Sequence, residues 1–240
     1  MGREDRDDRE NQDDRIQASG TITLIEQQIK DKSRYNLYID DSFVFSVHED
    51  VVVKHRLRKG TVLNQDDVDR VLADEAAQKA QLQALRWIGS RAYSRNEMTI
   101  RLRKKGFDQA AIDKAIGFLL QYNYLNDEQF AGQLAEQRIY GQKKGRMWVK
   151  QELIHKGIAR DTVDDALGGI DPEREYAAAL ELAKKKWRLT NGEPAEKQRK
   201  TAAFLLRRGF GNALAMRIVR QVAEEAGETD GAAMDDDFYD

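Results

Sequence analysis

The pattern of hydrophobic and polar positions changes once along the chain. In its first part, apolar and polar side chains alternate at the two-residue period of β-strands in three runs, at residues 21–24, 35–39 and 43–47. Asp40-Asp41 separates the last two runs closely enough for a tight hairpin, and the polar residues 30–33 separate the first two. The sequence therefore predicts a small antiparallel β-meander with one buried face.

A helical period replaces this alternation after Lys59-Gly60. Asn64 is a plausible N-cap, and the apolar positions that follow it, such as Val68 and Val71, have helical spacing. The remainder of the chain contains only two prolines, Pro172 and Pro194, and each stands where a helix can begin. We expect one helix to cover the meander and the rest of the chain to be helical.

The helical part contains three similar stretches, at residues 102–107, 153–158 and 205–210. Each has a leucine, a glycine four positions later and an apolar residue after the glycine; the glycines, Gly106, Gly157 and Gly209, lie 51 and 52 residues apart. Glycine readily takes the left-handed conformation that ends a helix, and the apolar residue after it can contact the leucine. Three such stops predict three copies of one helical unit, which would stack into an elongated, curved body.

The expected helix starts agree with these stops. Ser94 with Glu97 and Asn126 with Gln129 have the spacing of a capping box, and Asp171-Pro172 is an N-cap followed by proline at the first helical position. The fold class is therefore mainly α: three tandem three-helix repeats, with a small N-terminal antiparallel β-meander plus helix. The expected divisions are an acidic disordered tail (1–15), the meander and helix domain (16–83), the three repeats (84–130, 131–170, 171–222) and a second acidic disordered tail (223–240).

Composition excludes several classes of protein. The 240 residues include no cysteine, which removes disulfide frameworks, thiolate nucleophiles and cysteine-ligated zinc. No apolar run approaches the roughly 18 residues of a membrane span, and the charged start is unlike a signal peptide, so we expect a cytoplasmic protein without a membrane partner. No nucleophile elbow, HExxH motif or phosphate-binding GxxxxGK[ST] loop occurs. We therefore expect no enzyme, no cofactor, no metal and no small-molecule substrate.

The formal net charge of -2 hides an uneven distribution. Residues 1–15 carry a net charge of -3 and residues 223–240 a net charge of -8, which leaves +9 for residues 16–222. Within that body, residues 84–222 carry +11 and residues 16–83 carry -2. A surface of this kind favours a polyanionic partner, either nucleic acid or a protein assembly built on it. A well-solvated helical surface would have the same composition.

Motifs spread over the three repeats resemble those of the RecX family, the regulators of the RecA recombinase. The matching residues are Arg91, Tyr93, Ser94, Glu97, Met98, Leu102, Lys105-Gly106-Phe107, Ile112, Tyr124-Leu125-Asn126-Asp127, Phe130-Ala131, Arg138, Gly145, Glu152-Leu153, Lys156-Gly157-Ile158 and Ala166-Leu167. The resemblance covers roughly residues 84–222, and residues 21–63 are similar to the N-terminal extension of the longer, Gram-positive-type members. Asn123 stands where the family pattern has glycine, and Asn126 where it has aspartate.

This resemblance implies a regulatory protein that binds the RecA filament on single-stranded DNA and mainly inhibits filament growth and activity. Its setting would be homologous recombination, DNA repair and the SOS response. Two other interpretations stay open on the residues alone. A DNA-binding array of helix-turn-helix type would select DNA sequence, and a protein-binding scaffold with another partner would show no affinity for single strands.

Basic side chains in clusters are the candidates for contact with the recombinase or DNA. They are Arg91, Arg95, Arg101, Lys104, Lys105, Lys143, Lys144, Arg146, Lys150, Lys184, Lys185, Lys186, Arg207 and Arg208. A cation just before a helix-ending glycine, such as Lys105 or Arg208, also stabilises the last turn through the helix dipole. The loop cations Lys143, Lys144 and Arg146 have no such obvious structural role, so we favour them, with residues 184–186, as contacts.

Overall fold

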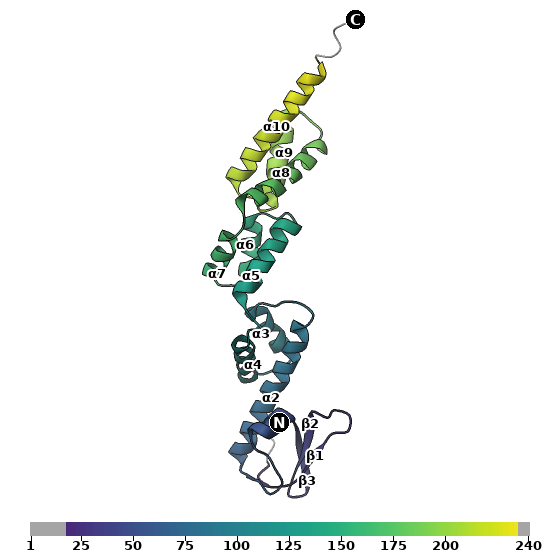
Figure 1. Ribbon diagram of the computed structural model, residues 1–240, viewed down its shortest axis with the longest axis vertical. Helices are drawn as coiled ribbons and strands as arrows, with labels where there is room; N and C mark the ends of the chain where they lie inside the picture. The colour runs from purple at the N-terminus through teal and green to yellow at the C-terminus, as the bar shows by residue number, and fades with distance from the viewer. Residues whose placement is uncertain (1–17, 235–240) are drawn as a thin grey trace, which may run out of the picture. The chain divides into compact units, whose positions relative to one another are not determined.

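The structure is a computed structural model that describes residues 18–234, with side chains described up to residue 227. Its elements are labelled in Figure 1. The described residues form two compact units: the first holds residues 18–87 together with Leu102–Leu119, and the second holds Ile88–Arg101 and residues 120–234. The predicted acidic tail at residues 1–15 lies outside the described residues.

The strands of the first unit form one antiparallel sheet in the order β3-β2-β1-β4. Their bounds are β1 Gly20–Gln27, β2 Arg34–Ile39, β3 Ser42–His48 and β4 Val62–Leu63. The first three are the expected meander, with Asp40 and Asp41 both at positive φ (46° and 65°) in the tight turn between β2 and β3. The two-residue strand β4 and the short helix α1 (Glu49–Lys54) were not predicted, because neither is long enough to show a periodicity.

Helix α2 (Gln65–Ile88) packs on the buried face of this sheet. Its Val68 and Val71 join Leu37 and Val47 of the strands in the core, where all four are at most 1% exposed. The predicted N-cap is confirmed. The Asn64 side chain accepts a hydrogen bond of 2.9 Å from the backbone N–H of Asp67, whose carboxylate accepts one of 3.1 Å from the N–H of Asn64.

Asp74 of α2 ties three helices of the first unit together. Its carboxylate lies 2.8 Å from Lys54 at the end of α1 and 2.8 Å from His55 directly after it. It also lies 2.8 Å from Lys114 of α4 (Gln109–Gln121). Burial acts to raise the pKa of Asp74, but the hydrogen bonds from Lys114, Lys54 and His55 outweigh it and hold this pKa far below its ordinary value. The ionised carboxylate is therefore the form that the fold favours.

The helices of the remaining chain come in threes, as the repeat predicts (Figure 1). The first group is α2, α3 (Arg95–Lys104) and α4; the second is α5 (Asp127–Glu136) with the π-helical turn η1 (Gln137–Gly141), α6 (Arg146–His155) and α7 (Arg160–Gly168); the third is α8 (Pro172–Arg188), α9 (Pro194–Arg207) and α10 (Asn212–Met234). The boundaries expected after residues 83 and 130 fall inside α2 and α5, because both helices continue through them.

Three helix stops have the predicted geometry. Gly106, Gly157 and Gly209 have φ values of +96°, +80° and +88°. In each, the N–H of the apolar residue after the glycine donates to the carbonyl of the leucine, from Phe107 to Leu102, Ile158 to Leu153 and Phe210 to Leu205, at 3.1–3.3 Å. This is the six-to-one hydrogen bond of a Schellman motif. Sequence spacing thus located all three helix ends.

The predicted helix starts are confirmed as well. Ser94 Oγ accepts a hydrogen bond from the N–H of Glu97 at 3.1 Å, Asn126 accepts from Gln129 at 2.9 Å, and Asp171 accepts from Glu173 at 2.9 Å. Asn123 has a positive φ of 56°, and asparagine is one of the residues that tolerate this conformation. That geometry explains why asparagine can stand where the family pattern has glycine.

The C-terminal part departs from expectation. Residues 223–240 were predicted to be a disordered tail, but α10 continues to Met234. Val222 is 4% exposed, and Ala223 and Ala226 pack on the core of the third group, which also holds Trp187 and Phe210. Small apolar side chains therefore extend the helix past the start of the acidic run. Residues 235–240 lie outside the described residues.

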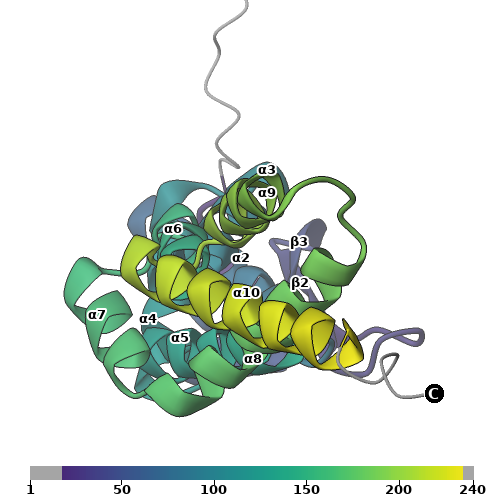
Figure 2. The same ribbon diagram turned by 90° about the horizontal axis from the view of Figure 1, so that it is seen from above.

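Figures 1 and 2 show α8, α9 and α10 side by side, with α10 crossing the other two. Their core is separate from that of α5–α7, which contains Phe130, Ile139, Val149 and Leu153. Each of these two helix groups thus buries its own apolar side chains, as the units of a repeat protein do. The two groups contact each other through their loops and helix ends.

Candidate partner-binding surface

Successive helix groups of the second unit meet at a recurrent joint. At the joint of the second and third groups, the N–H of Gly145 donates to the carbonyl of Arg208 at 2.9 Å, and the N–H of Met147 donates to that of Gly209 at 3.0 Å. A Cβ at Gly145 would lie 2.1 Å from the carbonyl carbon of Gly209, so glycine is required for this approach. The start of α6 is therefore joined to the stop of α9.

The start of α3, which belongs to the second unit, contacts the second group in the same way. Ser94, the N-cap of α3, donates from Oγ to the carbonyl of Lys156 at 2.7 Å, and a Cβ at Gly157 would lie 2.5 Å from the side chain of Asn96. In both joints, the start of the second helix of one group contacts the stop of the second helix of the next group. The stop motif therefore both ends a helix and connects two repeats.

The structure gives Arg146, a favoured contact candidate, a partly buried position with structural partners. Its Nε donates to the Glu175 carboxylate at 2.6 Å, and its two terminal nitrogens donate to the carbonyls of Leu167 and Ile170 at 3.1 and 2.8 Å. The side chain of Glu175 is 8% exposed. These bonds hold the start of α6 against the α7–α8 connection and α8.

Several other candidates gather around the same joint or pair with nearby carboxylates. Lys143 pairs with Glu181, Lys144 lies 4.3 Å from the ring centroid of Trp148, and Arg208 donates to the carbonyl of Gln142 at 3.2 Å. Lys150 pairs with Asp164 at 2.6 Å and Lys184 with Glu225 at 2.7 Å. These contacts balance part of the positive charge that the sequence places in this part of the chain. The role of these cations in binding stays a prediction.

Arg91 and Arg101 surround one aromatic ring. The guanidinium carbon of Arg91 lies 3.7 Å from the ring centroid of Tyr93, and Arg101 donates to the hydroxyl of Tyr93 at 2.7 Å. The Tyr93 ring itself is 5% exposed. It positions the two cations and offers no open face for a base to stack on.

The remaining candidates, within residues 18–227, make no side-chain ion pair and are exposed or partly exposed. They are Arg95, Lys104 and Lys105 on or next to α3, Lys185 and Lys186 in the last turn of α8, and Arg207 at the end of α9. Cations without a neighbouring carboxylate keep their full charge for a polyanion. The role of this subset in contacting a partner stays a prediction.

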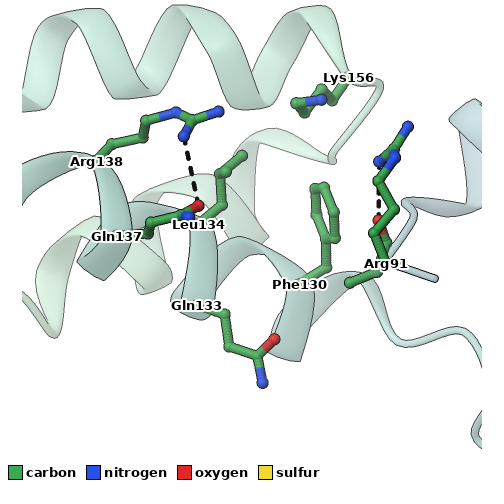
Figure 3. A pocket seen from close by; sticks show the side chains of 8 residues that line it. Arg91, Phe130, Gln133, Leu134, Gln137, Arg138 and Lys156 are labelled. Carbon is green, nitrogen blue, oxygen red and sulfur yellow. Dashed lines mark hydrogen bonds between the residues drawn. The ribbon is translucent and has the colours of Figure 1, made fainter. Parts of the chain in front are cut away.

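A pocket of about 630 Å³ lies beside the joint of the first and second groups (Figure 3). Its lining residues are Arg91, Ala92, Phe130, Gln133, Leu134, Gln137, Arg138 and Lys156. Arg138 makes a bidentate contact with Glu152, with both nitrogen–oxygen distances 2.8 Å, and Lys156 lies 2.8 Å from Glu97.

These ion pairs shift the pKa values of Arg138 and Glu97. The contact with Glu152 raises the pKa of Arg138. Burial acts to raise the pKa of Glu97, but the hydrogen bonds from Lys156 and the Ser94 N–H lower it overall.

Arg138 and Lys156 were not among the predicted contact residues. Both belong to the motifs that carry the resemblance, but neither stands in a run of basic residues, which was the signal used to select candidates. A folded structure was needed to show that they converge with Arg91, which is distant in sequence.

Residues 18–227 contain no cluster of three or more histidine, aspartate or glutamate side chains placed to hold a metal ion. None of the helices that the structure describes is long and apolar enough to cross a membrane.

An N-terminal antiparallel sheet followed by jointed three-helix groups defines a tandem helical-repeat protein, and comparison with known proteins places it in a family. Residues 20–64 match the regulatory protein RecX N-terminal domain, and residues 80–119, 126–167 and 173–219 match the first, second and third three-helix domains of RecX. The chain belongs to the RecX family of regulatory proteins.

Individual relatives agree with the family models. The chain is 32% identical over 206 residues to the regulatory protein RecX of Clostridium perfringens (strain SM101 / Type A) and 31% identical over 204 residues to that of Clostridioides difficile (strain 630). Each alignment covers 85% of this chain and 96% of the relative. A crystal structure of regulatory protein RecX superposes with a TM-score of 0.74 at 26% identity, covering 84% of this chain and 98% of the other.

Proposed function

We propose that this protein binds the RecA filament on single-stranded DNA and limits filament growth and activity by binding rather than by catalysis. Membership of the RecX family supports a regulatory role. The observation that carries the binding mode is the set of unpaired cations. Five cations have no carboxylate partner within the described residues, in a region with a net charge of +11. They are Lys185, Lys186 and Arg207 of the third group, Lys104 at the end of α3 and Lys105 directly after it.

A repeated architecture suits a filament as partner. A filament presents the same surface at regular intervals, and successive helix groups joined in the same way present related surfaces in series. Several weak contacts on one chain together give a higher overall affinity, because the first contact raises the effective concentration of the next binding surface. Affinity for the assembled filament should therefore exceed affinity for either free RecA or bare DNA.

Fluorescence anisotropy of a labelled oligothymidylate, bare or covered by RecA with a slowly hydrolysed ATP analogue, tests this proposal. We expect tighter binding to the covered strand. Lys185→Ala with Lys186→Ala should weaken binding to it, whereas Lys184→Ala, in which the lost cation is already paired with Glu225, should have a much smaller effect. Equal affinity for bare and covered strands would favour a general single-strand binder.

A steep salt dependence is expected for the DNA part of this interaction. If roughly 6 phosphates of a single strand are neutralised, the logarithm of affinity for bare DNA should fall with the logarithm of salt concentration at a slope near about -4. A flat response would favour a scaffold that binds only protein.

A further inference from the structure

The pocket beside the first joint has an apolar centre and a cationic rim. Figure 3 places Arg138 and Arg91 at its opposite ends, with Leu134 and Phe130 between them and Lys156 above Phe130. Its volume of about 630 Å³ lies within the range of ligand sites in proteins, roughly 300 to 1,000 Å³. It can therefore hold a short stretch of extended chain.

The charge of the pocket is positive although its cations have internal partners. Arg91, Arg138 and Lys156 face two carboxylates, those of Glu97 and Glu152, which leaves one positive charge unbalanced. Arg91 has the longest distance to its carboxylate, 3.5 Å from Glu97, and its side chain is 49% exposed. One terminal nitrogen donates to the carbonyl of Ala92 at 2.8 Å, and the guanidinium stacks on Tyr93. Arg138 gives Nε and one terminal nitrogen to Glu152, and its other terminal nitrogen reaches Gln137 only at 3.4 Å. Both arginines thus retain donors for an incoming carboxylate.

Two features argue against a nucleic-acid strand in this pocket. Phe130 is 8% exposed and Lys156 Nζ lies 5.8 Å from its ring centroid, so no open ring face remains for a base. Glu97 and Glu152 pair with the cations, and they would repel a continuous row of phosphates more than two separate carboxylates. An extended peptide needs fewer charges and offers apolar side chains for the centre.

We propose that this pocket binds a short acidic segment of a protein partner, in which two carboxylate side chains flank an apolar one. The carboxylates pair with Arg91 and Arg138, and the apolar side chain contacts the small exposed parts of Leu134 and Phe130, which are 9% and 8% exposed (Figure 3). The inference rests on the proposed function, because it supplies a protein contact separate from the unpaired cations proposed to bind the filament. It adds the chemistry of the partner segment and the residues that recognise it.

Gln137 allows a test that leaves the internal ion pairs in place. It is exposed at the start of η1, and Figure 3 shows its side chain directed toward Arg138. Gln137→Glu would place a carboxylate beside Arg138 and occupy its remaining donors, while Gln137→Lys would add a cation to the rim. The two variants should change binding in opposite directions. Gln198→Glu, on the exposed surface of α9, is the matched control for adding one negative charge.

The probe is a fluorescein-labelled peptide, Gly-Asp-Glu-Phe-Leu-Asp-Glu-Gly, titrated with the full chain at low salt and followed by anisotropy. We expect the wild type and Gln198→Glu to bind alike, Gln137→Glu to bind about tenfold more weakly, and Gln137→Lys to bind more tightly. The same peptide with asparagine and glutamine in place of its acidic residues should not bind. Circular dichroism of each variant checks that the fold is retained.

Three results would overturn the proposal: no binding of the acidic peptide, equal binding by both Gln137 variants, or a loss of oligothymidylate affinity in Gln137→Glu as large as the loss for the peptide. The last would identify the pocket as a nucleic-acid site. These outcomes are distinguishable from failure of the proposed function, which is measured with the RecA-covered strand and the lysine variants.

Discussion

Arg146 illustrates how a residue selected as a contact candidate acquires a structural explanation. Its guanidinium donates hydrogen bonds to the carboxylate of the buried Glu175 and to two backbone carbonyls. We predict that Arg146→Ala lowers the free energy of unfolding by about 3 kcal/mol, since it leaves a buried carboxylate without its cation. Urea unfolding followed by far-ultraviolet circular dichroism measures this.

Lys150→Ala is the comparison for that prediction. Lys150 pairs with Asp164 at 2.6 Å, but both side chains are well exposed, and such pairs contribute about 0 to 1 kcal/mol. Unfolding midpoints that are equal for the two variants would show that the Arg146 network does not stabilise the fold.

Asp74 predicts a pH dependence of the first unit. Its pKa is held far below the ordinary value of about 4 in the folded state, so it contributes stability that is fully present above that value and is lost as the pH falls toward the lower, folded pKa. Asp74→Asn should therefore be destabilised by about 2 kcal/mol at neutral pH. The difference from wild type should shrink below about pH 4. A gap that stays constant from pH 7 to pH 3 in urea unfolding would contradict this explanation.

At the scale of elements, the glycine stops serve two separable purposes. All three need positive φ, but only Gly157 and Gly209 are also approached closely by another helix group; nothing lies within 4 Å of a Cβ at Gly106. Alanine at either Gly106 or Gly209 should cost about 1 kcal/mol of backbone strain. Gly209→Ala should cost about 2 kcal/mol more, because its Cβ would lie 2.4 Å from the backbone nitrogen of Trp148.

Amide hydrogen exchange separates the two effects. The N–H groups of Gly145 and Met147 donate across the joint, so Gly209→Ala should speed their exchange, while Gly106→Ala should leave it unchanged. Unchanged protection of these two amides in Gly209→Ala would show that the joint does not depend on the close approach.

Local signals explain how much of the fold could be predicted. Each helix cap and each glycine stop depends on only a few adjacent residues. The caps at Ser94, Asn126 and Asp171 and the three glycine stops are all found in the structure as expected. The short elements β4 and α1 carry no periodicity. The extension of α10 was missed because its acidic side chains dominated the composition, while its small apolar residues pack on the third core.

The candidate site was less predictable because ion pairing is a long-range property. Lys143 and Lys144 form a basic run in sequence, but Glu181, the partner of Lys143, is distant in sequence and lies next to it only after folding. Conversely, Arg91, Arg138 and Lys156 are isolated in sequence and converge in one pocket. Runs of charge identify where cations are, whereas tertiary contacts decide which of them remain available to a partner.

At the scale of the whole chain, the uneven charge predicts competition between acidic and basic parts. Residues 228–240 contain six acidic side chains and follow the last residues packed on the third core, so their removal spares Ala226 and the Lys184–Glu225 pair. We predict that this truncation tightens binding to a bare oligothymidylate at low salt, with the difference vanishing at about 1 M salt, where charges are screened within about 3 Å. Identical affinities for the two proteins at low salt would remove a competing role for the acidic segment.

Regulation of the recombinase filament is the central claim, and its effect on ATP hydrolysis is the most direct test. RecA is assembled on single-stranded DNA, and its steady-state ATP hydrolysis is followed while this protein is added well below one copy per RecA. We predict a progressive loss of hydrolysis at these low ratios, weaker for Lys185→Ala with Lys186→Ala than for the paired-cation control Lys184→Ala. Hydrolysis that is unchanged even at equal amounts of the two proteins would contradict the account.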